Sequence, residues 1–173
     1  MFENLFEDGS LVDYIQNNTR DPWQNTPFEN YVFMSPKQKG EFGERFVHKF
    51  MTDKGSHVER AKTSTAGHDR VIDGILTEIK FSLATRKGVG VKDDSFIINH
   101  VSKGKDWERL VFFGINKNSE SRLVFFTKED FLENYQDFFA SQQGGQKIGN
   151  DDFICTKVKE LVESDWVKDI SEW

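Results

Sequence analysis

Two acidic residues and a lysine flank a predicted β-hairpin, and their types and spacing could support metal-assisted chemistry. Asp69 enters the hairpin, Asp73-Gly74 forms its turn, and Glu78 and Lys80 follow on the outgoing strand. Asp-Gly between runs of β-branched and aliphatic residues is a strong signal for a two-residue turn. The predicted ladder pairs are Ile72–Ile75, Val71–Leu76, Arg70–Thr77 and Asp69–Glu78. Two carboxylates would then face each other.

Opposed carboxylates need a compensating charge, because like charges directly across a ladder are destabilising. Mg²⁺ prefers oxygen ligands and usually binds through one or two carboxylates together with substrate phosphate. Asp69 and Glu78 are therefore candidate metal ligands, whereas Asp73 is assigned to the turn. The alternative is an ordinary surface strand end, where Lys80 on the same face neutralises one acid. The register leaves both interpretations open.

A helix that precedes the hairpin could supply a third acid. Ser35-Pro36 is a typical helix start, and Gly55 is a plausible stop. Apolar residues recur between them at helical spacing, namely Phe42, Phe46, Val47, Phe50 and Met51. Glu44 shares a face with some of these residues and could point inward, or it could be an ordinary surface glutamate. Gly40 and Gly43 interrupt the helix, which suggests a close backbone approach, and Glu41 is expected to pair with Arg45 in solvent.

Composition is typical of a globular protein with a polar surface. The chain has 173 residues, of which 36% are hydrophobic and 30% charged, and it contains 17 Phe. We expect a single domain, residues 1–173, with a substantial core. No apolar run is long enough to span a bilayer, and the first residues lack the pattern of a signal peptide. We therefore expect a cytoplasmic protein without membrane contact, and the single Cys155 agrees with a reducing compartment.

Charge is distributed unevenly along the chain. The net charge is −6, but residues 1–34 carry six acids and one base, and residues 150–173 carry seven acids and three bases. The middle of the chain is left with a net positive charge. Residues 60–92 contain seven bases, which are Arg60, Lys62, Arg70, Lys80, Arg86, Lys87 and Lys92, against the three acids of the hairpin. Basic charge around an acidic cluster fits a site that holds a metal and a polyanion together, although solvated loops can have the same composition.

The other elements suggest an α/β protein in three parts. Residues 1–34 are expected to form an arm that packs over the core, with a short helix from Leu11 to Gln16 capped by Ser10. The catalytic core, residues 35–126, would add the strands His57–Lys62, Arg109–Ile115 and Arg122–Phe126, and a helix over Ser95–Ser102. Residues 127–173 would contribute a Thr127-capped helix through Phe139, a loop, the strand Phe153–Thr156 and a C-terminal helix that includes Trp166.

This order of motifs resembles the PD-(D/E)xK, or restriction-endonuclease-like, nuclease superfamily. The resemblance covers roughly residues 36–115 and rests on Gly40 and Glu44 in the helix, Asp69 before the turn and Glu78-Ile79-Lys80 after it. His68 occupies the position of the superfamily's proline. Glu-x-Lys by itself has almost no specificity, since ordinary composition yields it by chance. The order and register of the whole set give the resemblance its weight.

The resemblance implies a restriction-endonuclease-like core, a mixed central β-sheet flanked by helices, and metal-dependent hydrolysis of DNA. Asp69, Glu78 and the main-chain carbonyl of Ile79 would hold Mg²⁺, for which Mn²⁺ could substitute. Lys80 would orient or activate the attacking water, and Glu44 would assist through a water or a second metal. The products would carry 5′-phosphate and 3′-hydroxyl ends. Phosphates of double-stranded DNA would be contacted by Lys62, Arg70, Arg86, Lys87 and Lys92.

Three functions follow from this set of residues. The first is an endonuclease of restriction type, acting as a homodimer because a two-fold protein suits both strands of a symmetric site. The second is a structure-specific repair or recombination nuclease, such as a junction resolvase. The third is a non-catalytic DNA-binding protein with the same fold, which the acidic ends of the chain mildly favour and the intact acids and lysine oppose. His100 is interpreted as structural, and Gly88-Val89-Gly90 lacks the context of a phosphate-binding loop.

Overall fold

The computed structural model describes residues 3–19, 21–63, 65–84, 96–116, 121–142 and 151–173. These residues form two compact units, Met1–Met34 and Ser35–Trp173. Among the described residues, no helix combines the length and the apolar character that crossing a bilayer requires.

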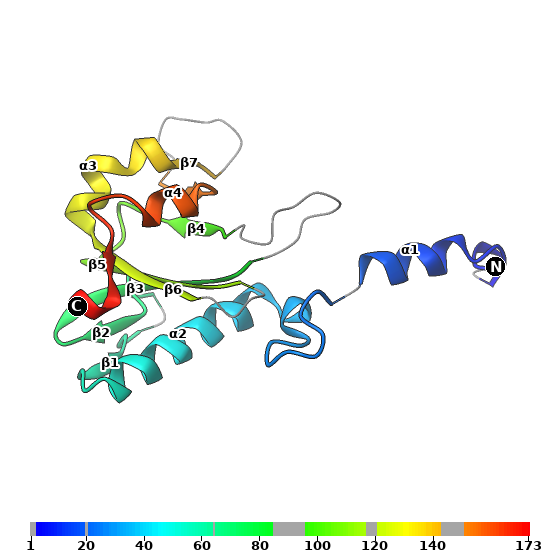
Figure 1. The fold of residues 1–173 in the computed structure, drawn as a ribbon, viewed down its shortest axis with the longest axis horizontal. Helices are drawn as coiled ribbons and strands as arrows, with labels where there is room; N and C mark the ends of the chain where they lie inside the picture. The colour runs from blue at the N-terminus through cyan, green and yellow to red at the C-terminus, as the bar shows by residue number, and fades with distance from the viewer. Residues whose placement is uncertain (1–2, 20, 64, 85–95, 117–120, 143–150) are drawn as a thin grey trace. The chain divides into compact units, whose positions relative to one another are not determined.

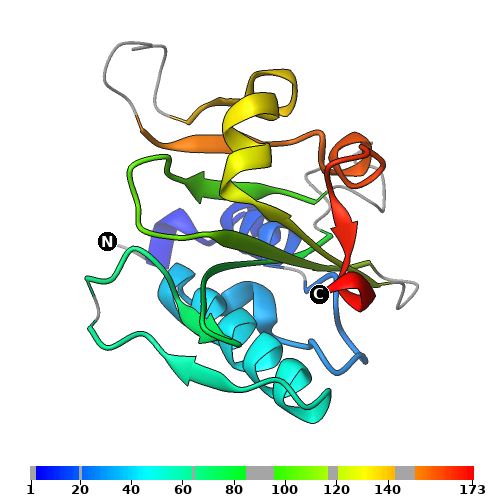
Figure 2. The ribbon, with the colours of Figure 1, turned by 90° about the vertical axis from the view of Figure 1, so that its left-hand side faces the viewer.

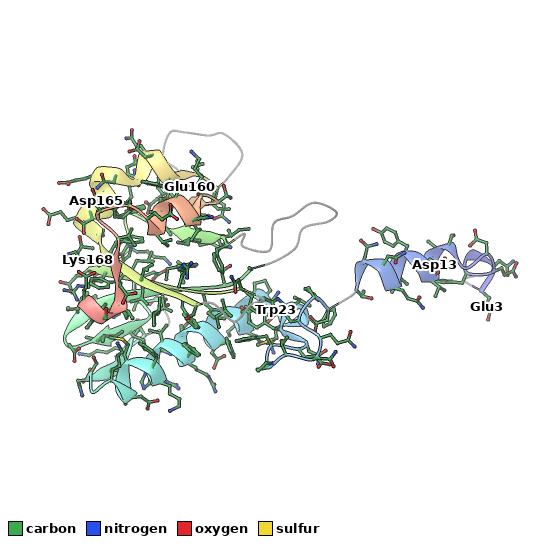
Figure 3. The ribbon with its side chains drawn as sticks, in the orientation of Figure 1. Glu3, Asp13, Trp23, Glu160, Asp165 and Lys168 are labelled. Atoms are coloured by element: carbon green, nitrogen blue, oxygen red, sulfur yellow. The ribbon has the colours of Figure 1, made fainter. Side chains whose placement is uncertain are left out.

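The N-terminal unit is small and contains the 3-10 turns η1 (Glu3–Leu5) and η2 (Tyr31–Phe33) and the helix α1 (Ser10–Asn18). The helix has no buried residue, and side chains such as that of Asp13 project from it (Figure 3). The prediction that Ser10 caps this helix was wrong. Gly9 is the N-cap, and Ser10 donates both its N–H and its hydroxyl to the Asp8 carboxylate.

A six-stranded mixed sheet organises the second unit, with strand order β1-β2-β3-β5-β6-β9. Its strands are β1 (Val58–Arg60), β2 (Arg70–Ile72), β3 (Ile75–Leu83), β5 (Arg109–Ile115), β6 (Ser121–Thr127) and β9 (Lys168–Asp169). Only the central pair β3–β5 is parallel among these neighbours, and the others are antiparallel. A smaller antiparallel sheet contains β4 (Ile98–Val101), β8 (Phe153–Cys155) and β7 (Phe139–Ser141). The predicted mixed central sheet flanked by helices is confirmed.

One face of the main sheet is covered by the long helix α2 (Pro36–Asp53), as Figure 1 shows. A capping box between Ser35 and Gln38 fixes its start, as the Ser-Pro pattern predicts. A Cβ added at Gly43 would lie 2.3 Å from Cβ of Phe81, so this glycine allows α2 to approach β3 closely. The helix then packs Phe46 against Phe113, with ring centroids 4.2 Å apart. Gly40 has no atom within 4 Å of such a Cβ and does not need to be glycine for packing reasons.

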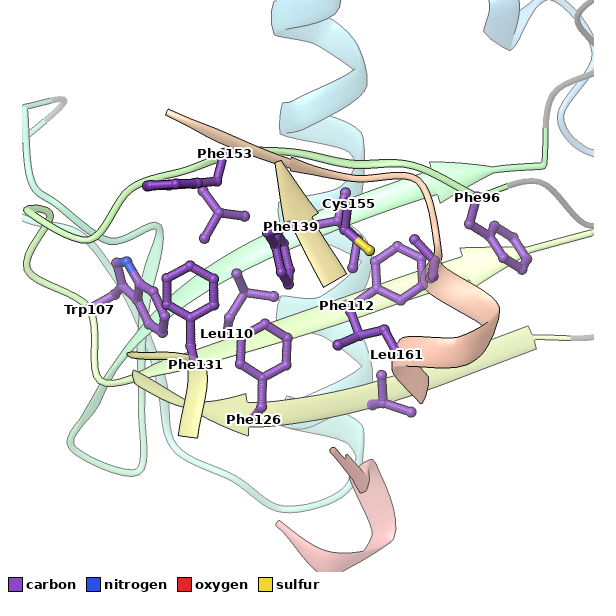
Figure 4. Packing of buried hydrophobic residues seen from close by; sticks show 14 of the residues in the cluster. Phe96, Trp107, Leu110, Phe112, Phe126, Phe131, Phe139, Phe153, Cys155 and Leu161 are labelled. Carbon is purple, nitrogen blue, oxygen red and sulfur yellow. The ribbon is translucent and has the colours of Figure 1, made fainter. Parts of the chain in front are cut away.

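The opposite face of the main sheet, on the side of the small sheet (Figure 2), carries the larger apolar core. The helices α3 (Lys128–Phe138) and α4 (Val158–Val162) lie on this side, together with the small sheet. Leu110 and Phe112 of β5 and Phe126 of β6 pack against Phe131 of α3 and Phe139 of β7 (Figure 4). Apolar side chains therefore pack on both faces of the main sheet.

Several predicted elements have different limits or a different type. Residues 98–101 form the strand β4 rather than a helix, because Ile98 and Val101 are buried against β8. Thr127 caps α3 as predicted, with its side chain accepting a hydrogen bond from the Asp130 N–H, but Phe139 belongs to β7. Trp166 follows α4 rather than lying within it.

Candidate active site

The hairpin turn has the predicted register. Asp73 and Gly74 have φ angles of 51° and 84°, as a type I′ turn requires. Three of the predicted ladder pairs are formed, joining residues 70–72 to residues 75–77. Asp73 accepts a hydrogen bond from the His57 N–H at 2.8 Å and another from the Trp173 indole at 3.3 Å. Its carboxylate is therefore part of the turn.

The fourth predicted pair, Asp69 with Glu78, is not formed. The Asp69 N–H donates to the carbonyl oxygen of Thr77 at 3.0 Å, although the ladder already pairs Thr77 with Arg70. Two residues of one strand thus lie opposite one residue of the other, which is a β-bulge. The bulge ends the regular ladder and gives the Asp69 side chain a new direction.

The Asp69 carboxylate lies along the edge of β3 instead of projecting from the face that carries Glu78. Its Oδ2 accepts a hydrogen bond from the Ile79 N–H at 2.7 Å. The N–H and C=O of one strand residue point to the same edge, so the Ile79 carbonyl is directed toward Asp69 as well. Successive strand residues point their N–H and C=O groups to alternate edges. Leu76, three residues before Ile79, accordingly has its N–H and C=O bonded to Glu108 on the opposite edge of β3. A carboxylate and a main-chain carbonyl thus share one edge.

Glu78 is the most buried acid of the site. Its side chain is 4% exposed and accepts a hydrogen bond from Lys80 Nζ at 2.7 Å. Lys80 is 15% exposed, and its ammonium group is therefore largely withdrawn from solvent. A second ammonium, that of Lys105, lies 3.6 Å from the same Oε1 atom of Glu78. The pairing of Lys80 with an acid, which the alternative of an ordinary surface strand end predicted, is present. Both side chains are largely buried, however, and a second cation lies beside them.

The environment of Asp69 opposes its ionisation. Burial is the largest cause, and the negative charge of Glu78 is the next, and together they raise the pKa of Asp69 from 3.8 to about 6. Glu44 raises this pKa further, while the Ile79 N–H and Lys80 partly offset the effect. Two acids in one partly desolvated place favour a bound cation, which would remove their mutual repulsion.

Glu44 points toward the sheet, as one of the two interpretations of the helix predicted. Its Oε2 accepts a hydrogen bond from Arg70 Nη1 at 2.8 Å, and the Arg70 side chain is only 7% exposed. The same Nη1 also donates to the main-chain carbonyl of Asp69 at 2.6 Å. Glu44 therefore supports the bulge through Arg70 and belongs to the α2 side of the sheet. Glu41 pairs with Arg45 in solvent, as expected.

An open cavity of about 460 Å³ lies beside Asp69. Its wall includes Glu44, Asp69 and Arg70 and a group of basic side chains from α2 and from the region of β1, namely Lys37, Arg45, Arg60 and Lys62. Of the predicted DNA-binding residues, Lys62 is exposed at this cavity and Arg70 is buried in its wall. Arg86, Lys87 and Lys92 lie outside the described residues.

The residues present offer oxygen ligands for a divalent cation. The Asp69 carboxylate lies at the edge of β3 beside the Ile79 backbone, and Glu78 projects from the adjacent face. Burial first, and the charge of Glu78 second, raise the pKa of Asp69. Within the described part of the chain, no cluster of three or more His, Cys, Asp or Glu side chains could hold a metal ion. The donor set fits Mg²⁺, which commonly takes one or two carboxylates and fills its other positions with water and phosphate.

Sequence reasoning missed Lys105 and several basic residues of the cavity. Lys105 lies 25 residues after Lys80 in a short polar stretch without periodicity, and only the parallel pairing of β5 with β3 brings that stretch to Glu78. Lys37 and Arg45 could have been found from the helix pattern, since each lies about one turn from Glu41 on the same helix face.

Comparisons with known proteins add little to these observations. No protein-family model matches the chain, and no curated protein matches it in sequence. One solved structure with a similar arrangement is that of a bacterial homing endonuclease, I-Ssp6803I. The two share 14% sequence identity with a TM-score of 0.43, over 58% of this chain and 74% of that one. At this level of similarity the residues of the site carry the functional argument.

Proposed function

We propose that the protein is a metal-dependent endonuclease that hydrolyses phosphodiester bonds of double-stranded DNA, with a core of the PD-(D/E)xK kind. One observation carries the proposal. The Asp69 carboxylate accepts a hydrogen bond from the Ile79 N–H, while the preceding residue, Glu78, is buried and bonded to Lys80. The Asp69 carboxylate thus lies at the backbone N–H between Glu78 and Lys80, and Asp69 also lines a cavity whose wall carries both basic and acidic side chains.

Asp69, Glu78 and the Ile79 carbonyl would hold Mg²⁺ or Mn²⁺, which would supply charge neutralisation of the phosphoryl group and a more acidic water. The protein's own groups have separate tasks. The Ile79 N–H holds Asp69 in one orientation, and the contact of Arg70 with the Asp69 carbonyl fixes the bulge. Lys80, whose ammonium is held against Glu78, orients the attacking water. Glu44 fixes Arg70 and so acts on Asp69 indirectly.

Basic side chains of the cavity would bind the DNA backbone. Lys62, Arg60 and Lys37 line the approach to Asp69 and carry positive charge that suits phosphate groups. Arg70 would act mainly by supporting Asp69, because Glu44 already occupies its guanidinium. Affinity that depends on such contacts falls as salt rises, since each phosphate contact releases counterions. We expect a homodimer if both strands of a symmetric site are cut.

The test is incubation of the full chain with supercoiled plasmid and with a four-way DNA junction, in Mg²⁺ or in EDTA. Asp69→Asn and Lys80→Met are compared with wild type, and Lys49→Gln serves as a control on the exposed face of α2. We expect Mg²⁺-dependent cutting by wild type and by the control, and a loss of at least 100-fold in both site variants. Binding without any metal-dependent cutting would contradict the nuclease function.

The two substrates separate the two enzymatic alternatives. Discrete plasmid fragments indicate an endonuclease of restriction type, whereas cutting confined to the junction indicates a structure-specific nuclease. Sedimentation equilibrium on the same preparation measures whether the active species is a dimer. The fold and the acids are common to both alternatives, so the substrate decides between them.

A further inference from the structure

A second lysine approaches the candidate site from a different part of the chain. Lys105 lies in the connection between β4 and β5, and its Nζ is 3.6 Å from Glu78 Oε1. Lys80 already donates a hydrogen bond to that same oxygen at 2.7 Å. We propose that Lys105 binds a non-bridging oxygen of the substrate phosphate, a role that rests on the nuclease function proposed above and extends it to a specific contact.

Charge balance is the first argument for a phosphate ligand. Glu78 carries one negative charge and has two ammonium groups beside one of its oxygens. Lys80 alone would neutralise it, and a second cation nearby is repelled by the first. Lys80 and Lys105 together balance Glu78 and Asp69, so a divalent cation bound as proposed above would leave the site with surplus positive charge. An anion that docks beside Glu78 would use this charge.

The geometry and exposure of Lys105 give the second argument. Its ammonium lies beyond the 2.7–3.2 Å range of a normal N–H···O hydrogen bond to Glu78. The side chain is 46% exposed, compared with 15% for Lys80. Lys105 therefore keeps donors available on the solvent side, while the donors of Lys80 are turned inward. A substrate phosphate that approaches from solvent would meet Lys105 first.

The backbone around Lys105 is held in place from several directions, which is the third argument. Asp151 accepts hydrogen bonds from the N–H groups of Lys103 at 2.6 Å and Gly104 at 2.9 Å. The carbonyl of Lys105 itself accepts a hydrogen bond from Lys128 Nζ at 2.6 Å. An exposed lysine on a backbone that is fixed at neighbouring positions loses less freedom when it binds a ligand.

The same connection is also tied to the loop that leads into Asp69. His68 Nδ1 lies 3.2 Å from the Asp106 carbonyl oxygen. A Cβ added at Gly67 would lie 2.2 Å from the Asp106 nitrogen, so glycine is needed for this close approach. The backbone that presents Lys105 thus contacts the residues immediately before Asp69. This contact sets the spacing between the lysine and the acid.

The test compares wild type with Lys105→Gln, Lys105→Arg and the control Lys49→Gln. Binding of a short fluorescent duplex is measured by anisotropy in EDTA over a range of salt, and cleavage is measured under single-turnover conditions in Mg²⁺. We expect Lys105→Gln to weaken duplex binding roughly tenfold and to lower the salt slope by about one, with at least tenfold slower cleavage. Lys105→Arg should retain most of the duplex affinity and of the cleavage rate, and Lys49→Gln should match wild type.

Two further measurements distinguish a phosphate contact from a structural role. Lys105→Gln should keep the Tm of wild type and should bind Mn²⁺ at least as tightly, because it removes a positive charge beside Glu78. A lower Tm with weaker Mn²⁺ binding, or wild-type duplex binding, would overturn the proposal. If neither wild type nor Lys105→Gln cleaves DNA, but Lys105→Gln still binds the duplex more weakly than wild type, the nuclease function fails and the phosphate contact stands. A wild type that binds no duplex overturns both.

Discussion

The Asp69 carboxylate accepts a hydrogen bond from the backbone N–H of Ile79, ten residues later in the chain, at 2.7 Å. It occupies the place where another strand residue would have continued the β2–β3 ladder. The bulge at Asp69 and Arg70 thus replaces a backbone pairing with a side-chain acid, and it does so beside a second acid. Bulges commonly re-aim side chains near active sites.

The first prediction concerns pH and the stability of the metal-free protein. Folding raises the pKa of Asp69 from 3.8 to about 6, mainly by burial and secondly by the charge of Glu78. The stability linked to this group is therefore fully present below about pH 4 and is lost as pH rises to 6. Asp69→Asn should remove this dependence and stabilise the metal-free protein at pH 7 by on the order of 1–2 kcal/mol. Urea unfolding in EDTA across this pH range measures it. An equal dependence of the free energy of unfolding on pH in wild type and in Asp69→Asn would contradict this prediction.

The second prediction concerns the metal and the folded state. A ligand that binds only the native protein stabilises it by about 2.7 kcal/mol at a concentration 100 times its Kd. Mg²⁺ or Mn²⁺ should therefore raise the Tm of wild type at pH 7 and should raise that of Asp69→Asn far less. Thermal scans with and without EDTA measure the shifts, and Asp73→Asn is the control because Asp73 belongs to the turn. An equal shift in all three proteins would indicate that the cation binds elsewhere.

The third prediction concerns the pair between Glu44 and Arg70. Glu44→Gln would leave the buried Arg70 guanidinium without its charged partner, and Arg70 Nε already has no hydrogen-bond partner among the described residues. We expect a loss of about 1–3 kcal/mol in the free energy of unfolding. Glu41→Gln breaks an exposed pair with Arg45 on the same helix and should cost less than about 0.5 kcal/mol. Similar denaturation midpoints for both variants would show that the Arg70 pair contributes no more than a surface pair.

The fourth prediction tests the close packing of α2 on β3. A methyl group at Gly43 would lie 2.3 Å from Cβ of Phe81, so Gly43→Ala must displace the helix or the strand. We expect it to cost about 1–3 kcal/mol of stability. Gly40→Ala meets no neighbouring atom within 4 Å and should be neutral or stabilising by up to about 1 kcal/mol, because alanine favours helix. The denaturant midpoint should fall for Gly43→Ala, and it should stay unchanged or rise for Gly40→Ala.

Local patterns in the sequence predicted several elements of the fold. The turn at Asp73, the start of α2 after Ser35 and the cap of α3 at Thr127 all depend on residues adjacent in sequence, and all three are present. The strand β4 was predicted as a helix, because burial of Ile98 and Val101 against β8 is a tertiary effect. The bulge at Asp69 was also missed, because a two-residue turn fixes only the pairs closest to it.

Long-range pairing decided the remaining part of the site. Nothing around Lys105 marks it as a partner of Glu78, since the two meet only when β5 aligns in parallel beside β3. Arg70 illustrates the same limit. Its position in a basic stretch predicted a contact with DNA, but the structure buries it against Glu44 of a distant helix. Composition indicates charge, and only the fold shows which charges are already paired.

The division of the site between a hairpin and a parallel strand has a consequence for how the chain folds. A hairpin such as β2–β3 can close within about 1–10 μs, and it brings Asp69 to the Ile79 N–H, next to Glu78, by itself. The parallel β3–β5 pairing, which brings Lys105, requires closure of a much longer loop and is intrinsically slower. The acids would thus meet before their second cation arrives. Refolding should accordingly include an early species with an assembled turn, and the late step should be sensitive to ionic strength because it unites opposite charges.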